Sequence, residues 1–240
     1  MVCGIRSLSS GYGRKDVYSG SAMTEAMSRV DKAAATRARV IDSARALFLL
    51  QGYAATTTRQ VASHAKVTER TLFNIVANKS QLLREVLLSY VFTDDFGPLL
   101  EREDFTPVLG APSVNQFLDE YSKWVVSLHT HTSATAEMAR AAASVDAGAA
   151  EIWRWGNAQQ IVDLGDLAAH LDQRGWLRPG LFADEVARSL AVLSGHESYW
   201  RLVNEQHWSR ARYRRWLRRH CAVELLDVEP NRNESEDVEP

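Results

Sequence analysis

Cysteine is scarce in this 240-residue sequence, and long apolar runs are missing. Cys3 and Cys221 are too few for a disulfide framework or a cysteine-based zinc site, and Cys221 lies on an apolar helical stripe where we expect a buried thiol. A membrane-spanning helix needs roughly 18 or more consecutive apolar residues, and a secretory signal needs an apolar core segment. The sequence shows neither, so we expect no membrane partner and a place in the cytoplasm.

The motifs of several common enzyme classes are absent as well. The sequence contains no glycine-rich phosphate loop, no G-x-S-x-G elbow, no H-E-x-x-H and no C-x-x-C pair. His129 and His131 are two residues apart, which places them on different sides of a helix, and no cysteine or carboxylate cluster accompanies them. We therefore predict no catalytic site, no metal site and no cofactor, and we expect that the protein is not an enzyme.

The formal net charge of −2 conceals two oppositely charged segments. Residues 29–89 hold ten Lys or Arg and four Asp or Glu, a net charge of +6. Residues 90–240 hold fifteen basic and twenty-four acidic side chains, a net charge of −9. A local basic segment in an otherwise acidic chain favours nucleic-acid binding by that segment.

Residues 52–83 hold two short helical patterns around a tight turn, and they predict a DNA-binding helix-turn-helix. The first pattern covers about 58–64 and follows threonines whose side-chain oxygens can accept hydrogen bonds from its first turn. The connection 66–68 buries one valine and ends on Thr68, whose hydroxyl can cap the second helix, about 69–76. The apolar positions of that second helix face inward, so we expect its outer face in the major groove.

The exposed side chains of this unit are expected to divide into phosphate contacts and base contacts. Arg70 to guanine and Asn74 to adenine are the chemically natural base pairings. Glu69 either reads a base edge or serves only as a negative charge at the helix N-terminus. We expect phosphate contacts from Thr58, Arg59, Phe73 and Lys79, base contacts from Glu69, Arg70, Thr71 and Asn74, and Thr68 in the same DNA-binding set.

The same stretch resembles the tetracycline-repressor (TetR) family of bacterial transcriptional regulators. The resemblance covers residues 36–90 and rests on T-T-T-R-Q-V-A, K-V-T, T-L-F-N and N-K-S-Q-L-L. It implies a homodimer, most often a repressor, that binds a palindromic operator in double-stranded DNA. It also implies that a small-molecule inducer in a second domain releases the protein by swinging the helix that begins near Lys79.

Two positions depart from the pattern of the resembled family. Phe73 stands where that family usually has tyrosine, whose hydroxyl contacts a phosphate, so one expected hydrogen bond is lost. Ile75 stands where a polar residue, often histidine, is usual, and any contact there would be apolar, for instance with a thymine methyl group.

Glycine, proline and charge divide the chain into expected segments. No strand alternation appears, so the predicted fold is all-α, with an N-terminal three-helix helix-turn-helix domain and a C-terminal helical bundle. The first helix is expected at about 34–50, and prolines and glycines predict a linker or long loop at 94–112. The segments are a disordered arm (1–30), the helix-turn-helix domain (31–78), a linking helix (79–93), a ligand-binding and dimerisation domain (94–226) and a disordered acidic tail (227–240). Helical patterns in the second domain fall at about 113–129, 132–145, 148–174, 181–205 and 209–226.

Tryptophan is confined to the second domain, where all seven occur. Aromatic side chains line pockets for flat or apolar ligands, although a helical bundle also needs large core side chains. We expect Trp124, Trp155 and Trp200 to line a ligand cavity because each lies mid-helix among apolar neighbours, and we add Tyr121 and Met138. The expected inducer is an apolar or aromatic small molecule.

The resemblance assigns the last two helical patterns to a four-helix bundle between two copies. On 181–205 the expected ridge is Val186, Leu190 and Leu193, and on 209–226 the expected stripe is Tyr213, Trp216, Leu217, His220 and Cys221. The arginines that flank this stripe are interpreted as solvating it or pairing with nearby acids rather than as a nucleic-acid patch.

One alternative to a regulator stays open. The chain could be a helical ligand-binding or protein-interaction module whose helix-turn-helix is only a packing unit. The apolar Phe73 and Ile75 favour that alternative, whereas the +6 charge of residues 29–89 opposes it.

Overall fold

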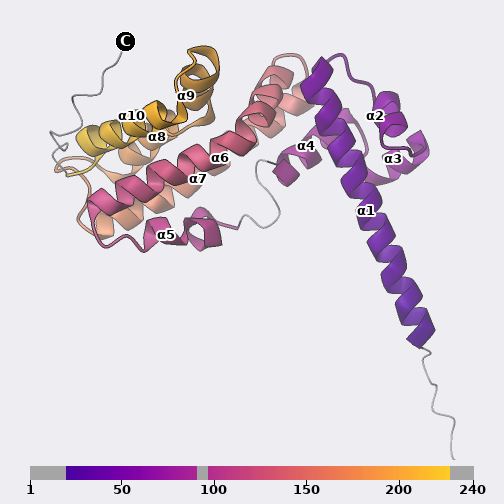
Figure 1. Cartoon of the computed structure of the whole chain (residues 1–240), viewed down its shortest axis with the longest axis horizontal. Coiled ribbons are helices and arrows are strands. Elements are labelled where there is room, and N and C mark those ends of the chain that lie inside the picture. The colour runs from indigo at the N-terminus through magenta and orange to yellow at the C-terminus, as the bar shows by residue number, and fades with distance from the viewer. Residues whose placement is uncertain (1–19, 91–96, 228–240) are drawn as a thin grey trace, which may run out of the picture. The chain divides into compact units, whose positions relative to one another are not determined.

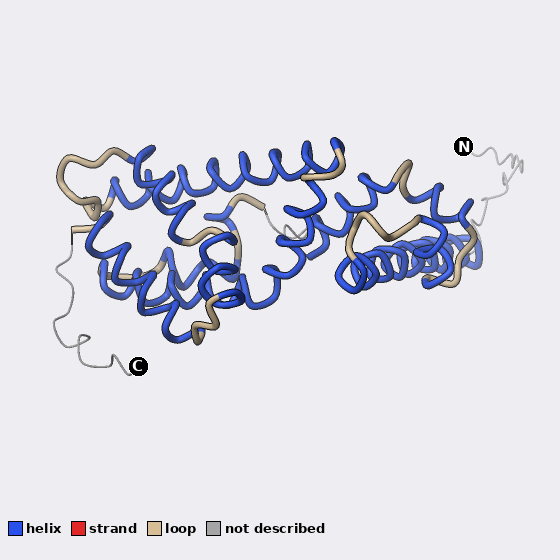
Figure 2. The backbone as a smooth tube through the Cα atoms, turned by 90° about the horizontal axis from the view of Figure 1, so that it is seen from above, coloured by secondary structure: helices blue, strands red, loops and turns tan. Residues whose placement is uncertain are grey.

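The computed structural model describes residues 20–90 and 97–227, with side chains described for residues 30–89 and 97–227. The regular elements within these ranges are helical, and one isolated bridge pairs Leu177 with Leu226 (Figures 1 and 2). The predicted all-α class is confirmed. None of the helices in the described part of the chain combines the length and the apolar character that a membrane crossing requires.

Internal contacts divide the chain into two compact units, residues 1–38 and residues 39–240. Helix α1 (Gly20–Gln51) begins in the first unit and ends in the second. The expected start near residue 34 was therefore wrong, and residues 20–30, expected in a disordered arm, are helical. These residues include two Ala, two Met, one Glu and one Arg, all of which favour helix by propensity. The rest of the expected arm and the acidic tail from residue 228 lie outside the described residues.

The helix-turn-helix consists of α2 (Thr58–His64) and α3 (Glu69–Ile75), followed by α4 (Lys79–Tyr90). Their apolar faces form one core with the second half of α1, in which Val40, Phe48, Leu72 and Leu82 are almost fully buried. The same core includes side chains from the end of α6 (Val114–Ala143) and the start of α7 (Ala147–Gln173). Those two helix ends therefore belong to the hydrophobic core of the helix-turn-helix.

The segment expected as a linker contains short helical turns. They are η1 (Leu99–Glu101), η2 (Glu103–Phe105) and α5 (Thr106–Leu109). Pro98 and Pro107 stand at the starts of η1 and α5, where proline is tolerated because the first N–H groups of a helix need no intrahelical partner. Leu99, Phe105 and Val108 are buried, so residues 99–109 belong to the core. Residues 94–96 of the expected linker and 91–93 of the expected linking helix lie outside the described residues.

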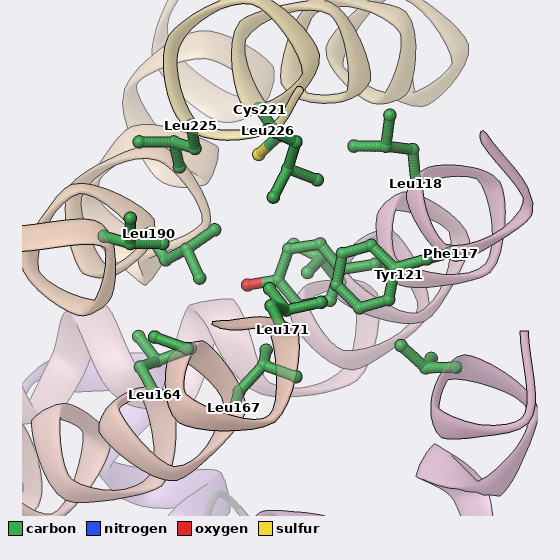
Figure 3. Packing of buried hydrophobic residues seen from close by; sticks show 14 of the residues in the cluster. Phe117, Leu118, Tyr121, Leu164, Leu167, Leu171, Leu190, Cys221, Leu225 and Leu226 are labelled. Carbon is green, nitrogen blue, oxygen red and sulfur yellow. The ribbon is translucent and has the colours of Figure 1, made fainter. Parts of the chain in front are cut away.

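The remaining helices form a second core, shown in Figure 3. Helix α6 is continuous, so the expected division near residue 130 was wrong. The expected helix 181–205 is divided into α8 (Ala183–Leu193), α9 (His196–Tyr199) and the π-helical η3 (Trp200–Glu205). Gly195 stands at the break, and a Cβ there would lie 2.3 Å from the backbone oxygen of Ala191. The last described helices are α10 (Arg210–His220) and the π-helical η4 (Cys221–Leu225).

Most of the apolar side chains expected at a dimer interface face this second core instead, whereas Leu193, Trp216 and His220 are half-buried. Val186, Leu190, Tyr213, Leu217 and Cys221 are at most 2% exposed within the single chain. The expectation failed because an amphipathic pattern shows that one face is buried but does not show whether the chain itself or a second copy covers it. The arginines of α10 partly hold it to α6, since Arg218 Nε lies 2.7 Å from Asp119 Oδ1.

Candidate DNA-binding surface and ligand cavity

The start of α2 is fixed by a reciprocal pair of hydrogen bonds. Thr57 Oγ1 accepts from the Gln60 N–H at 3.2 Å, and Gln60 Oε1 accepts from the Thr57 N–H at 2.8 Å. This capping box satisfies N–H groups that have no partner inside the helix. Thr56 is buried, with its hydroxyl donating to the Gly52 carbonyl at 2.8 Å, so Thr57 provides the cap.

The turn between α2 and α3 depends on one residue in the left-handed region. Lys66 has φ +55°, the Val67 N–H donates to the Ala62 carbonyl at 3.0 Å, and the Lys66 N–H donates to the Ser63 carbonyl at 3.1 Å. This pair of bonds is a Schellman motif, which usually places glycine at the left-handed position. Thr68 then caps α3 by accepting from the Thr71 N–H at 3.1 Å, as predicted. The angle between the two helices is thus set by backbone hydrogen bonds.

The outer face of α3 presents Arg70, Phe73 and Asn74, all exposed. Phe73 is 47% exposed. Ile75 is half-buried against the core of the helix-turn-helix, so Phe73 rather than Ile75 is the apolar side chain that this face offers. Thr71 is half-buried, and its hydroxyl lies 2.9 Å from that of Thr68.

Two of the expected DNA contacts pair with each other. Arg59 Nε lies 3.0 Å from Glu69 Oε1, and the two side chains are 83% and 43% exposed. Exposed ion pairs of this kind contribute roughly 0–1 kcal/mol to stability. The pair joins α2 to the first turn of α3 and is weak enough to open when a phosphate competes for Arg59.

Lys79 lies against Tyr53 at the start of α4. Its Nζ is 4.2 Å from the centre of the Tyr53 ring and donates to the Ala54 carbonyl at 3.3 Å. Partial burial lowers the pKa of Lys79, and the Asp146 carboxylate opposes that shift. The Tyr53 hydroxyl donates to Asp146 Oδ2 at 3.1 Å, and burial, followed by the Asp146 charge, raises the pKa of Tyr53.

The start of α7 packs closely on the start of α4. Asp146 caps α7 by accepting from the Ala149 N–H at 2.8 Å. A Cβ on Gly148 would lie 2.8 Å from Ser80 Cβ, closer than two carbon atoms can approach without a shift. The first turn of α7 is therefore packed closely on α4, and its cap residue Asp146 is joined by a hydrogen bond to Tyr53 in the segment before α2.

A cavity of about 160 Å³ lies among α6, α7 and the segment between α8 and α9. Leu87 of α4 and Leu99 of η1 also line it. Its aromatic walls are Tyr121, Trp124 and Trp153, and its polar lining includes His129, Ser194 and His196.

Only two of the five expected ligand residues line this cavity, namely Tyr121 and Trp124. Trp155 is 44% exposed, with the Arg84 guanidinium 5.9 Å from its ring centre. Met138 lies in the core of the helix-turn-helix, and Trp200 begins η3 outside the cavity lining. Trp153 was missed, although its separation of two residues from Trp155 already places it on a different side of the helix.

The two histidines of the cavity are buried. His129 Nε2 lies 2.8 Å from the Ser194 carbonyl oxygen, and its Nδ1 has no hydrogen-bond partner. Burial lowers the pKa of His129 to about 4, so the ring is neutral at pH 7. His196 Nε2 is 3.4 Å from Glu137 Oε2 without forming a hydrogen bond, and burial lowers the pKa of His196 as well.

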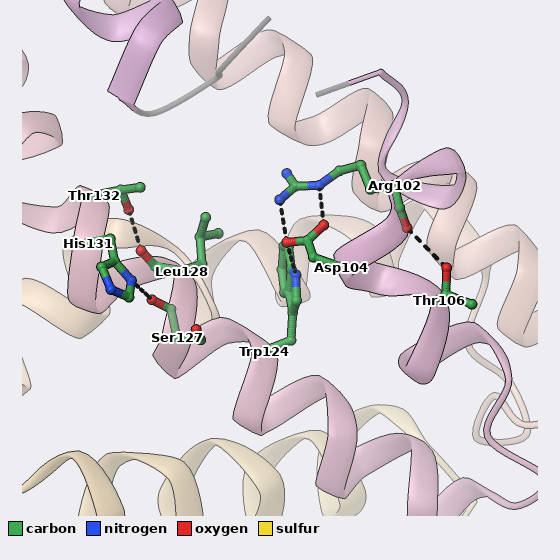
Figure 4. Close-up of polar contacts among 8 residues, drawn as sticks. All are labelled: Arg102, Asp104, Thr106, Trp124, Ser127, Leu128, His131 and Thr132. Atoms are coloured by element: carbon green, nitrogen blue, oxygen red, sulfur yellow. Dashed lines mark hydrogen bonds and ion pairs between the residues drawn. The ribbon is translucent and has the colours of Figure 1, made fainter. Parts of the chain in front are cut away.

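Trp124 stands between the cavity and an outer hollow of about 390 Å³, since both are lined by Arg102, Trp124, Leu128 and Thr132. Figure 4 shows how the indole is held. Trp124 Nε1 donates to Asp104 Oδ2 at 2.9 Å, and Arg102 donates to both oxygens of Asp104 at 2.9 and 2.7 Å. The hydrogen bonds from Arg102 are the largest cause of the lowered pKa of Asp104.

The described residues contain no group of three His, Cys, Asp or Glu side chains that could hold a metal ion. His129 is buried and His131 is exposed, with its Nδ1 2.9 Å from the Ser127 carbonyl, so the two lie on different sides of α6 as predicted.

Comparison with known proteins identifies the N-terminal part of the chain. Residues 40–86, which include α2, α3 and most of α4, match the family described as bacterial regulatory proteins, tetR family. This part of the chain is therefore similar to the DNA-binding region of TetR-family regulators. Members of this family are transcription factors rather than enzymes.

A curated relative is similar over a short stretch of the chain. The chain is 35% identical over 69 residues to the uncharacterized HTH-type transcriptional regulator YvkB of Bacillus subtilis (strain 168). The match covers 29% of this chain and spans 35% of the length of that relative.

Solved structures extend the likeness to the second domain. NalD, the secondary repressor of the MexAB-OprM multidrug efflux pump in Pseudomonas aeruginosa, is 23% identical with a TM-score of 0.61, over 81% of this chain and 97% of that one. SmeT of Stenotrophomonas maltophilia, in a complex with triclosan, is 16% identical with a TM-score of 0.63, over 80% of this chain and 92% of that one. At this identity the likeness establishes only the fold, which the chain shares with these two proteins along most of its length.

Proposed function

We propose that the protein is a sequence-specific transcription regulator, acting as a repressor in the cytoplasm, that leaves its operator when a small molecule binds in its second domain. The observation that carries the proposal is the doubly capped helix-turn-helix, which presents Arg70, Phe73 and Asn74 on one exposed face. The surrounding residues 29–89 carry a net charge of +6, which favours the approach of DNA.

The roles proposed for these side chains follow from their chemistry. Arg59 and Lys79, with Thr58, would position the protein on phosphates, and Arg70 and Asn74 would read guanine and adenine in the major groove. Phe73 would contribute an apolar contact. Glu69, Thr68 and Thr71 would act mainly through the ion pair with Arg59 and through the cap of α3.

We further propose a homodimer on a palindromic operator. Because the inner faces of α8 and α10 are buried, we propose that their outer faces form the contact. The outer side of α8 carries Asp184, Glu185 and the 69% exposed Val192, and the outer side of α10 carries Arg215 and Arg219. Laying α8 of one copy against α10 of the other would pair these opposite charges, and a two-fold dimer reads half-sites about 34 Å apart, one turn of DNA, or further apart.

Helix α4 would couple the ligand to the operator. It begins at Lys79 and Ser80, beside Tyr53 and Gly148, and its Leu87 lines the cavity. A ligand that packs on Leu87 would favour a position of α4 in which the recognition helices no longer fit DNA. Such a ligand shifts the equilibrium only by the ratio of its affinities for the two states. The triclosan bound to SmeT supports an apolar or aromatic ligand.

The proposed division of labour assigns DNA binding to residues 31–78, coupling to residues 79–93, and ligand binding and dimerisation to residues 94–226. The packing of α4 on the first turn of α7 supports this coupling, since α7 also provides Trp153 of the cavity.

Selection of bound sequences from a random duplex DNA library at near-physiological salt tests the proposal. We expect an enriched palindrome whose half-site spacing reports the dimer. Arg70→Ala should then cost roughly 1–3 kcal/mol on that operator and relax specificity at one base pair. Lys66→Ala is a matched control, since it removes an exposed charge from the turn rather than from the outer face of α3. Salt-sensitive binding without enrichment would instead favour a helical interaction module.

A further inference from the structure

The size of the cavity limits its ligand. A cavity of about 160 Å³ is close to an engineered apolar cavity of about 150 Å³ that binds benzene. The flat side chains of Tyr121, Trp124 and Trp153 supply most of the aromatic wall, and Leu87 and Leu164 supply aliphatic wall. Space and lining together fit one six-membered aromatic ring with a small substituent.

His129 adds a specific polar requirement. A carbonyl oxygen can only accept, so the 2.8 Å contact with the Ser194 oxygen places the hydrogen of the ring on Nε2. Nδ1 of the neutral ring is then an acceptor, and it is buried without a partner. His129 is 5% exposed and is one of the residues that line the cavity. A buried acceptor without a donor is unfavourable, and a bound molecule with an O–H or N–H group could remove that cost.

The other charged groups of the cavity disfavour an anion. Asp163 and Glu197 line the cavity, and the charge of Arg102 is met by the two oxygens of Asp104. A carboxylate or phenolate ligand would therefore meet carboxylates without a cation to balance it.

We propose that the cavity binds a neutral, single-ring aromatic molecule with a hydroxyl or amino group, and that His129 Nδ1 accepts the hydrogen bond from that group. The inference deepens the proposed function and rests on it for its regulatory meaning, but not for the binding itself.

Three probes of matched shape test the proposal: phenol, anisole and toluene. Phenol can donate a hydrogen bond, anisole carries the same oxygen without a donor, and toluene carries no polar atom. Binding to the full chain without DNA is measured by calorimetric titration at constant pH. We expect phenol to bind on the order of tenfold more tightly than anisole or toluene, the size of one good hydrogen bond.

The variants His129→Phe and His131→Phe locate the effect. His129→Phe should remove the preference for phenol and leave toluene bound at least as tightly, whereas His131→Phe, a substitution of the exposed histidine on the same helix, should change nothing. If His129→Phe does not fold, ¹⁵N-histidine NMR of the unaltered protein replaces it. Phenol, but not toluene, should then shift the ¹⁵N resonance of the unprotonated Nδ1 of His129.

Equal binding of phenol and anisole, a preference for phenol that survives in His129→Phe, or failure of all three probes to bind would overturn the inference. Binding of phenol through His129 without release of a selected operator would contradict the proposed coupling and leave the inference standing. If a different molecule released the operator and phenol did not bind, the proposed coupling would stand and the inference would be overturned.

Discussion

The Tyr53 hydroxyl donates a hydrogen bond to Asp146 Oδ2 at 3.1 Å and so joins the segment before α2 to the cap of α7. The two residues are distant in sequence, and the ring of Tyr53 also supports Lys79. The face of the Tyr53 ring thus contacts Lys79, which is proposed to bind a DNA phosphate, and the Tyr53 hydroxyl contacts the second domain.

Tyr53→Phe should remove that bond and keep the ring beneath Lys79. We expect a loss of about 1 kcal/mol in the free energy of unfolding, because a partly buried carboxylate loses one donor. Urea unfolding of Tyr53→Phe, Asp146→Asn and the double variant forms a cycle that isolates the pair. A coupling energy near zero would show that the bond contributes nothing to stability.

Lys66→Gly should stabilise the protein by up to about 1 kcal/mol. Lys66 is held at φ +55°. This backbone conformation costs a residue with a Cβ roughly 1–2 kcal/mol, whereas it costs glycine little. The unfolded chain of the glycine variant is more flexible, which offsets part of the gain in stability. Lys66→Ala removes the same charge and keeps the Cβ, so its stability should stay near that of the parent. Equal stabilisation in both variants would trace the effect to the lysine side chain instead.

Phe73→Tyr should raise affinity for the selected operator several-fold, the effect of about one hydrogen bond to a phosphate. A phenol hydroxyl carries no charge, so the slope of log affinity against log salt should not change. Fluorescence anisotropy at several salt concentrations measures both quantities. Unchanged affinity would indicate that the edge of this ring does not face the DNA backbone.

Acid should destabilise the protein below about pH 6.5, in part through His129. The pKa of His129 is about 4 in the folded state and about 6.5 when unfolded, so between these values the unfolded chain binds more protons and stability falls with decreasing pH. The slope from this group is at most about 1.4 kcal/mol per pH unit. Urea unfolding from pH 7 to pH 5 should show a shallower decline in His129→Phe than in the parent.

His131→Phe serves as the control for that comparison, because His131 is exposed. A decline of the same steepness in His129→Phe and the parent would assign the acid sensitivity to other groups. His196 is one such group, since burial lowers its pKa in the same direction.

Sequence reasoning was most accurate where structure is local. The cap at Thr68, the buried Leu72 and the boundaries of α2 and α3 follow from residues within one or two helical turns. The resemblance to the TetR family rests on the same short stretch.

The errors concern features that depend on tertiary packing. Trp153 and Trp155 are chemically alike and two residues apart, and the packing of α7 against its neighbours decides which of them lines the cavity. Leu190 and Leu217 form apolar ridges whether the chain itself or a second copy covers them. His129 Nδ1 is an acceptor because Nε2 donates to the Ser194 carbonyl, which is 65 residues away. The sequence near His129 therefore does not predict it.

The close approach of Gly148 to Ser80 has a consequence for how this sequence can diverge. A side chain at position 148 would require the Cβ at position 80 to move or to be absent, because only 2.8 Å separates Ser80 Cβ from the site of the new atom. Relatives that keep this packing should therefore change the two positions jointly, and a larger residue at 148 should be accompanied by glycine at 80. Such covariation would preserve the contact between α4 and α7 while the residues that form it are exchanged.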